Sequence, residues 1–229
     1  MKRRDYLTIT CFLIGIFVLF TVLTKTIDVQ FLNQTYSYYL GFHDFNFLIG
    51  NLATQFGRYE SMQKLSDVLL YISFGYVAIF AIVGVYQLIK RKSFAKVDKE
   101  LYLLLGSYVT LVIIYFMFEV VKVNYSPDTS EGLKASYPST HVFIGCSLFL
   151  VNTFTALKMI NPEKKWIDGV AYAATLVVCI LLTLTRSLSL KHWITDIIAS
   201  IILTGAFYFL YLFVYSNLIK EKETTLVAE

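Results

Sequence analysis

Charged residues are scarce in this chain. Only 16% of its 229 residues are Asp, Glu, Lys or Arg, whereas 57% are hydrophobic and the mean hydropathy is +0.62. So low a charge content excludes an ordinary soluble domain and indicates an integral membrane protein.

Proline and cysteine are also rare, with three of each. The prolines fall in predicted loops or at a predicted helix start, so they do not break the apolar segments. The cysteines lie inside those segments and show neither a disulfide framework nor the spacing of a zinc site. We expect Cys11, Cys146 and Cys179 to be packing residues.

Six apolar stretches are each long enough to cross a hydrocarbon core, which takes about 20 residues. They lie at roughly 7–27, 68–89, 100–121, 138–158, 166–186 and 193–216. No internal repeat divides the chain. We therefore expect one all-α domain over residues 1–229, an integral membrane bundle of six transmembrane helices. The first stretch has a charged start but no convincing cleavage pattern, and we expect a retained anchor.

The basic residues predict the orientation of the spans. Thirteen of the twenty Lys and Arg residues lie near the termini and in the loops at 90–99 and 158–165. Because basic flanks stay on the cytoplasmic side, both termini are expected in the cytoplasm, with the loops at 28–67, 122–137 and 187–192 outside. The net charge of +4 thus reflects topology, and nothing indicates a nucleic-acid partner.

The longest predicted outward loop, residues 28–67, mixes aromatic and polar residues. Aromatic side chains suit the headgroup layer of a membrane. A surface-lying helix within 44–66 and a loop packed over the bundle are equally compatible with this pattern.

Two of the three histidines stand at outward ends of predicted spans. His141 follows Pro-Ser-Thr at the start of the fourth span, and His192 precedes Asp196 by four residues. A step of four places both side chains on one face of a helix. A carboxylate there can hold an imidazole in one tautomer and support its positive charge, as a nucleophilic histidine requires.

Arg186 is expected on the same side of the membrane, and its planar guanidinium suits bidentate contact with phosphate oxygens. Pro138 can occupy the first turn of the fourth helix, so that free N–H groups of residues 139–141 point at a bound anion. His141 can then pass a proton to a leaving oxygen. Singly, each residue is more often an anchor or a packing residue, but their gathering on one side predicts a phosphate-handling site.

At these positions the sequence resembles the type 2 phosphatidic acid phosphatase family, membrane enzymes that share a three-part signature with vanadium haloperoxidases. The second part, Pro-Ser-Gly-His in the family, is similar to Pro138-Ser139-Thr140-His141. The third, Ser-Arg-x5-His-x3-Asp, is similar to Thr185-Arg186-x5-His192-x3-Asp196, with the spacing intact. The resemblance covers the chain from about residue 100 onward, and the earlier part only by its number of spans.

The resemblance implies a phosphohistidine mechanism that needs neither a metal nor another cofactor. His192 would be the nucleophile, Asp196 its orienting carboxylate, and His141 the acid that protonates the leaving group. The residues implied to hold the phosphoryl oxygens are Arg186, Ser139 and Thr140. Most of the catalysis would then come from positioning and charge stabilisation.

The first part of the signature does not match. The family has Lys-x6-Arg-Pro, and aligning its proline with Pro127 puts Glu119 at the Lys position and Ser126 at the Arg position. Two phosphate-binding cations are therefore missing. Lys122 or Lys134 is a candidate substitute, although each is equally well a solvated loop lysine.

Three functions stay open on the sequence. The first is a lipid phosphatase at the outer face of the cell membrane, which hydrolyses a phosphate monoester or a diphosphate of an isoprenoid or phosphoglycerolipid. The second is a lipid phosphotransferase that uses the same His192 and an alcohol in place of water. The third is a non-catalytic relative that binds a lipid or a partner protein. The missing cations favour the third function, and the retained histidines oppose it.

Overall fold

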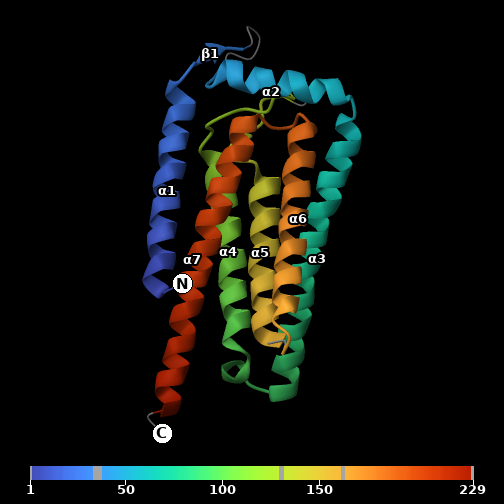
Figure 1. The fold of residues 1–229 in the computed structure, drawn as a ribbon. Coiled ribbons are helices and arrows are strands. Elements are labelled where there is room, and N and C mark those ends of the chain that lie inside the picture. Colours follow the sequence, from blue (N-terminus) through green and yellow to red (C-terminus); the bar gives the residue numbers. More distant parts are fainter. Residues whose placement is uncertain (1, 33–37, 129–131, 161–162, 228–229) are drawn as a thin grey trace.

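Six long helices form an upright bundle in the computed structural model of the chain (Figure 1). They are α1 (Arg3–Thr26), α3 (Tyr59–Arg91), α4 (Lys99–Val120), α5 (Thr140–Ile160), α6 (Trp166–Leu188) and α7 (Ile194–Val227). The structure describes residues 2–32, 38–128, 132–160 and 163–227, with side chains up to residue 218. Each of the six helices is apolar and long enough to cross a membrane. The predicted all-α bundle of six transmembrane helices is therefore confirmed.

α5 is the central helix of the bundle. It packs against α3, α4, α6 and α7, and nearly all of its residues from Val142 to Thr155 are buried. Gly145 allows the close approach of α6, because a Cβ atom there would lie 2.5 Å from Leu182 Cδ2. The outer helices instead expose many Leu, Ile, Val and Phe side chains, as a surface that faces lipid tails does.

A two-stranded hairpin follows α1 at one end of the bundle. β1 (Gln30–Phe31) and β2 (Tyr39–Leu40) pair antiparallel, with Gln30 opposite Leu40 and Phe31 opposite Tyr39. Gly41 holds the hairpin against the end of α1, since a Cβ atom at this position would lie 1.9 Å from the Thr24 carbonyl oxygen. Only glycine fits there without a backbone shift.

A surface helix, α2 (His43–Phe56), lies across the same end of the bundle and contacts α6 and α7 (Figure 1). It ends at Gly57, whose φ of 61° is in the left-handed region that glycine adopts without strain. Of the two alternatives for this segment, the surface-lying helix is the one observed.

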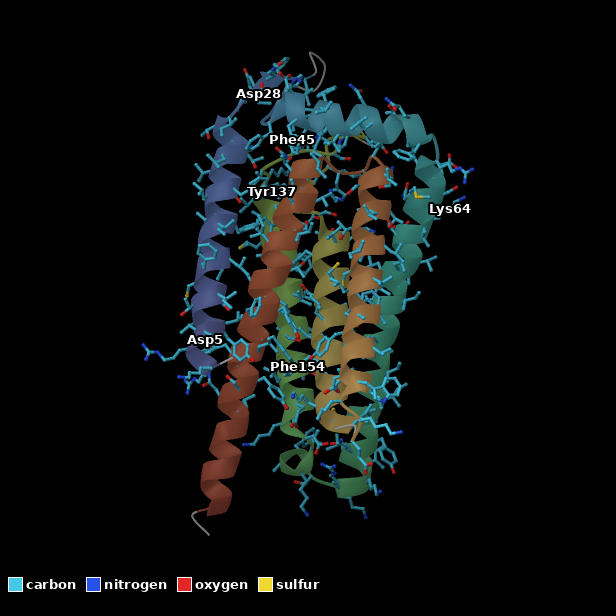
Figure 2. All side chains as sticks on the ribbon, viewed as in Figure 1. Asp5, Asp28, Phe45, Lys64, Tyr137 and Phe154 are labelled. Atoms are coloured by element: carbon cyan, nitrogen blue, oxygen red, sulfur yellow. The ribbon has the colours of Figure 1, made fainter. Side chains whose placement is uncertain are left out.

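The opposite end of the bundle carries the connection between α3 and α4, which contains the short 3-10 helix η1 (Phe94–Lys96). Figure 2 shows Asp5 towards this end and Asp28, Phe45 and Lys64 at the end covered by α2. Both termini of the chain lie away from α2 (Figure 1).

α3 is longer than its predicted span. The apolar stretch begins near residue 68, but the helix runs over 33 residues from Tyr59, which is about 50 Å at 1.5 Å per residue. Hydropathy missed the first turns because residues 59–67 are largely polar. This extension brings Asp67 into the bundle at the end that α2 covers.

Candidate active site

Four predicted site residues meet at the end of the bundle covered by α2. His141 lies in the first turn of α5, Arg186 in the last turn of α6, and Asp196 in the first turn of α7. His192 lies in the short loop between α6 and α7. These helix ends converge because α5 contacts both α6 and α7.

Two contacts hold the His192 imidazole in one orientation. Its Nδ1–H donates to the Ser136 carbonyl oxygen at 2.9 Å, and Arg186 Nη2 donates to its Nε2 at 3.2 Å. An imidazole that carries its proton on Nδ1 presents a lone pair on Nε2. Nε2 is thus the atom from which His192 can act as a nucleophile.

The Asp196 carboxylate is fully buried beside His192. Its Oδ2 lies 3.7 Å from His192 Nδ1, which is too far for a hydrogen bond. Instead, Oδ1 accepts from Asn124 Nδ2 at 2.9 Å and Oδ2 accepts from the Trp193 N–H at 3.1 Å. The Ser136 carbonyl therefore orients the His192 ring here, while Asp196 supplies a nearby negative charge and braces the first turn of α7.

The environment of His192 favours its neutral form. Burial lowers the pKa of His192, because a buried imidazolium loses hydration, and the Arg186 guanidinium lowers this pKa further. The Asp196 carboxylate acts in the opposite direction, and the net pKa stays below its usual value. The His192 imidazole is therefore neutral at neutral pH, the form that its predicted role as a nucleophile requires.

This environment predicts the acid side of the pH profile. The predicted mechanism uses neutral His192, so kcat/KM is expected to fall only as the pH drops through a value below about 6.5. Asp196→Asn removes a group that raises the pKa of His192, so the ratio of variant to parent kcat/KM should rise as the pH falls. Taking this ratio cancels the ionisation of the substrate itself. A ratio that falls with decreasing pH would contradict the assigned environment.

Asp67 joins His141 to Arg186, and sequence reasoning missed it. His141 Nε2–H donates to Asp67 Oδ1 at 3.0 Å, and the same oxygen lies 3.8 Å from Arg186 Nη1. Asp67 precedes the apolar stretch and belongs to no motif, so no sequence signal marked it. The site thus contains two histidine–aspartate pairs on either side of one guanidinium.

Three buried hydrogen-bond donors around this cluster form no hydrogen bond within the described part of the chain. They are Arg186 Nε, Ser136 Oγ and Ser139 Oγ. Leaving a buried donor unpaired is costly, so such atoms favour a ligand that accepts hydrogen bonds. A phosphate group has several acceptor oxygens and forms strong charge-assisted bonds with guanidinium. Arg186 and Ser139 therefore have unpaired donors, and their role as phosphate ligands stays a prediction.

The start of α5 differs from the sequence prediction. The helix begins at Thr140, and Pro138 precedes it after a cis peptide bond from Tyr137. The Ser139 N–H donates to the Asp196 carbonyl oxygen at 3.2 Å. Pro138 in the first turn and a free N–H group at Ser139 are therefore wrong, because the loop packs against the first turn of α7.

The other predicted phosphate ligands lie at the margin of the cluster. Thr140 is half-buried at the start of α5. Lys122 and Lys134 have exposed side chains in the loop between α4 and α5, unlike the buried Arg186 and Ser139. Their assignment as phosphate ligands stays a prediction.

Ser126, which aligns with the arginine of the first signature part, has a structural contact. Its Oγ donates to the Lys191 carbonyl oxygen at 3.0 Å, directly before His192. The Lys191 side chain pairs with Asp128 in the same loop. At the position of the signature arginine, Ser126 thus forms a neutral hydrogen bond. This bond holds the loop between α4 and α5 against the residue before His192.

Two buried asparagines brace the first turn of α7. Besides the bond from Asn124 to Asp196, Asn46 of α2 accepts from the N–H and the hydroxyl of Thr195, each at 3.2 Å. Asn46 also donates to the Gly41 carbonyl oxygen at 2.9 Å. α2 therefore caps the helix that carries Asp196, a role that usually falls to a neighbouring residue in the chain.

An apolar groove of about 480 Å³ reaches the cluster from the side of the bundle. It is lined from α3 by Leu70, Phe74 and Val77, from α4 by Tyr108, Leu111, Val112 and Tyr115, and from α5 by Thr140, His141, Ile144 and Leu148. His141 therefore belongs both to the groove and to the polar cluster.

The fold and the cluster define a membrane-spanning helical protein with a buried His–Arg–Asp site at one end. A family model of the PAP2 superfamily matches residues 72–220, more than half of the chain, and the chain belongs to this superfamily. The resemblance predicted from the motifs is thereby confirmed.

One solved structure extends the similarity over most of the chain. It is the crystal structure of a transmembrane PAP2 type phosphatidylglycerolphosphate phosphatase from Bacillus subtilis, with a TM-score of 0.61 and 16% sequence identity. The match covers 90% of this chain and 96% of the other. At this identity the likeness establishes a shared fold. Comparison with curated protein sequences gave no match.

Proposed function

We propose that this protein is a lipid phosphatase that hydrolyses a phosphate monoester or a diphosphate of a membrane lipid. The observation that carries the proposal is the position of His141, which contacts Asp67 in the polar cluster and also lines the apolar groove. A lipid phosphate needs both surroundings, one for its headgroup and one for its chain. Membership of the PAP2 superfamily supports this substrate class, as does the phosphatidylglycerolphosphate phosphatase named above.

The proposed reaction has two steps. His192 Nε2 attacks phosphorus, the bond from phosphorus to the leaving oxygen breaks, and His141, protonated on both ring nitrogens, gives that oxygen a proton. Water then loses a proton to His141 and attacks the phosphohistidine, which releases phosphate and restores His192. Arg186, Ser136 and Ser139 stabilise the charge on the phosphoryl oxygens.

Two further features of the proposal follow the family resemblance and the chemistry of the side chains. The Asp196 carboxylate, 3.7 Å from His192 Nδ1, stabilises the positive charge of the phosphorylated ring. The scheme uses side chains alone, with neither a metal nor another cofactor.

We also propose that the site faces outward, with both termini in the cytoplasm. The support is the excess of Lys and Arg at the ends of the spans opposite α2. In a Cys11→Ser background, Asn51→Cys on α2 should react with an impermeant thiol reagent added to intact cells, and Ala95→Cys in η1 should not. The reverse labelling would place the site in the cytoplasm.

Phosphate release from purified protein tests the function. Phosphatidic acid, phosphatidylglycerolphosphate and an isoprenoid diphosphate are compared with a short, water-soluble phosphate monoester. Release of inorganic phosphate from at least one lipid is expected. No release from any of them would refute the proposal, and a new phosphate monoester of an added alcohol would favour the phosphotransferase.

A substitution in the groove tests whether the groove binds the lipid chain. Val112→Trp fills the groove and should lower kcat/KM for the long-chain substrate about tenfold, since about two buried CH₂ groups at about 0.8 kcal/mol each are displaced. The short-chain substrate should be unaffected. Ile180→Trp on α6, also at an exposed apolar position, is the matched control. Equal losses for both substrates in Val112→Trp would contradict the groove as the site of the lipid chain.

A further inference from the structure

We propose that Asp67 makes the phosphate site selective for a phosphoryl group that carries one negative charge rather than two. The inference rests on the proposed function and specifies the charge class of its substrate. Asp67 Oδ1 lies 3.0 Å from His141 Nε2 and 3.8 Å from Arg186 Nη1. A phosphate oxygen that contacts both of these groups therefore lies beside the Asp67 carboxylate.

The charges around the cluster leave little positive excess for a dianion. Arg186 contributes one positive charge and His141 a second when it is protonated, whereas Asp67 and Asp196 contribute one negative charge each, and burial favours neutral His192. Lys191, the lysine directly before His192, forms an ion pair with Asp128 in the loop between α4 and α5. Glu119 and Ser126 stand where the family signature has its two further cations. One guanidinium thus faces both a resident carboxylate and the incoming phosphate.

The distinction between one and two charges follows from Coulomb's law. The repulsion between Asp67 and a bound phosphate doubles when the phosphate charge doubles. The Asp67 side chain is 33% exposed, so water weakens this repulsion without removing it. A phosphodiester carries one negative charge. A monoester meets the same condition when it binds as its monoanion, whose P–O–H can donate to the carboxylate.

A purely orienting role for Asp67 makes a different prediction. The hydrogen bond to His141 can hold that ring for proton transfer, and its loss would lower kcat. It would not change the relative affinities for singly and doubly charged ligands. The ratio of these two affinities therefore separates charge selection from positioning.

The experiment measures the Kd of two ligands by calorimetry for the full-length protein in detergent. A long-chain alkylphosphonate in alkaline buffer carries two negative charges, and its monomethyl ester carries one. Asp67→Asn is expected to strengthen binding of the ester about threefold and of the phosphonate about tenfold, since the Coulomb energy is proportional to ligand charge. The parental preference should persist in Asp67→Glu.

Glu60→Gln is the matched control. Glu60 is an exposed carboxylate in the first turn of the same helix, about 10 Å along α3 from Asp67 at 1.5 Å per residue, so salt screens its charge. Its replacement should change neither Kd by more than about twofold. Equal strengthening of both ligands by Asp67→Asn, or no strengthening, would overturn charge selection.

The binding measurement does not depend on turnover. A protein that releases no phosphate from any lipid, yet shows the shift in Asp67→Asn, would refute the proposed function and leave charge selection standing. An active phosphatase without the shift would overturn charge selection alone. Failure of both ligands to bind the parent and Asp67→Asn would also overturn it.

Discussion

His192→Ala is expected to abolish phosphate release from the lipid substrate, with a loss of about 10⁴-fold or more in kcat. The reason is that His192 Nε2, which contacts Arg186, carries the lone pair that attacks phosphorus in the proposed mechanism. No other group in this mechanism can form the covalent intermediate. Steady-state phosphate release measures the loss. Rapid quenching with labelled substrate should show an acid-labile label on the parent protein and none on His192→Ala.

His43→Ala is the matched control for this variant. His43 lies on α2 and contacts Asp44 and Phe47, outside the cluster around His192. The same change of residue type there should leave the rate within about twofold of the parental rate, as is usual for substitutions away from the active site and the buried core. Activity near the parental level in His192→Ala would end the phosphohistidine proposal.

Arg186→Met is expected to lower kcat/KM about 10²- to 10³-fold, or about 2.7–4 kcal/mol, the usual cost of removing one donor that stabilises transition-state charge. Arg186 is buried, and its Nε forms no hydrogen bond within the described residues. It also contacts His192 Nε2, so its charge would act where the proposed mechanism forms the new bond. Steady-state kinetics with the lipid substrate measure the effect.

Lys191→Met removes a neighbouring positive charge that pairs with Asp128. It should cost far less than Arg186→Met, because a partly exposed pair contributes little. Arg186→Lys should recover only part of the activity, since lysine lacks the planar fork that binds two oxygens. Equal losses in Lys191→Met and Arg186→Met would show that general electrostatic attraction, rather than a specific contact, accounts for the role of Arg186.

The sequence alone determined the membrane bundle, the six spans and the four residues that converge at one end of it. These features depend on local properties, namely hydropathy over about 20 residues and the spacing of a short motif. The step from His192 to Asp196 placed the two residues close together, but the helix that it predicted over both begins only at Ile194, so His192 lies in the preceding loop. The surface helix was one of two alternatives, since its aromatic residues suit either a helix or a packed loop.

Only the tertiary structure decided which groups these residues contact. Asp67 reaches His141 across 74 positions of sequence, and the Ser136 carbonyl reaches His192 across 56. Asn46 caps α7 from a helix 149 positions earlier. Asp67 belongs to no sequence motif, and every residue has a backbone carbonyl, so neither contact could be predicted from the sequence. Contacts of this kind exist because helix ends pack together in space, and packing between distant segments is not encoded in any local pattern of residues.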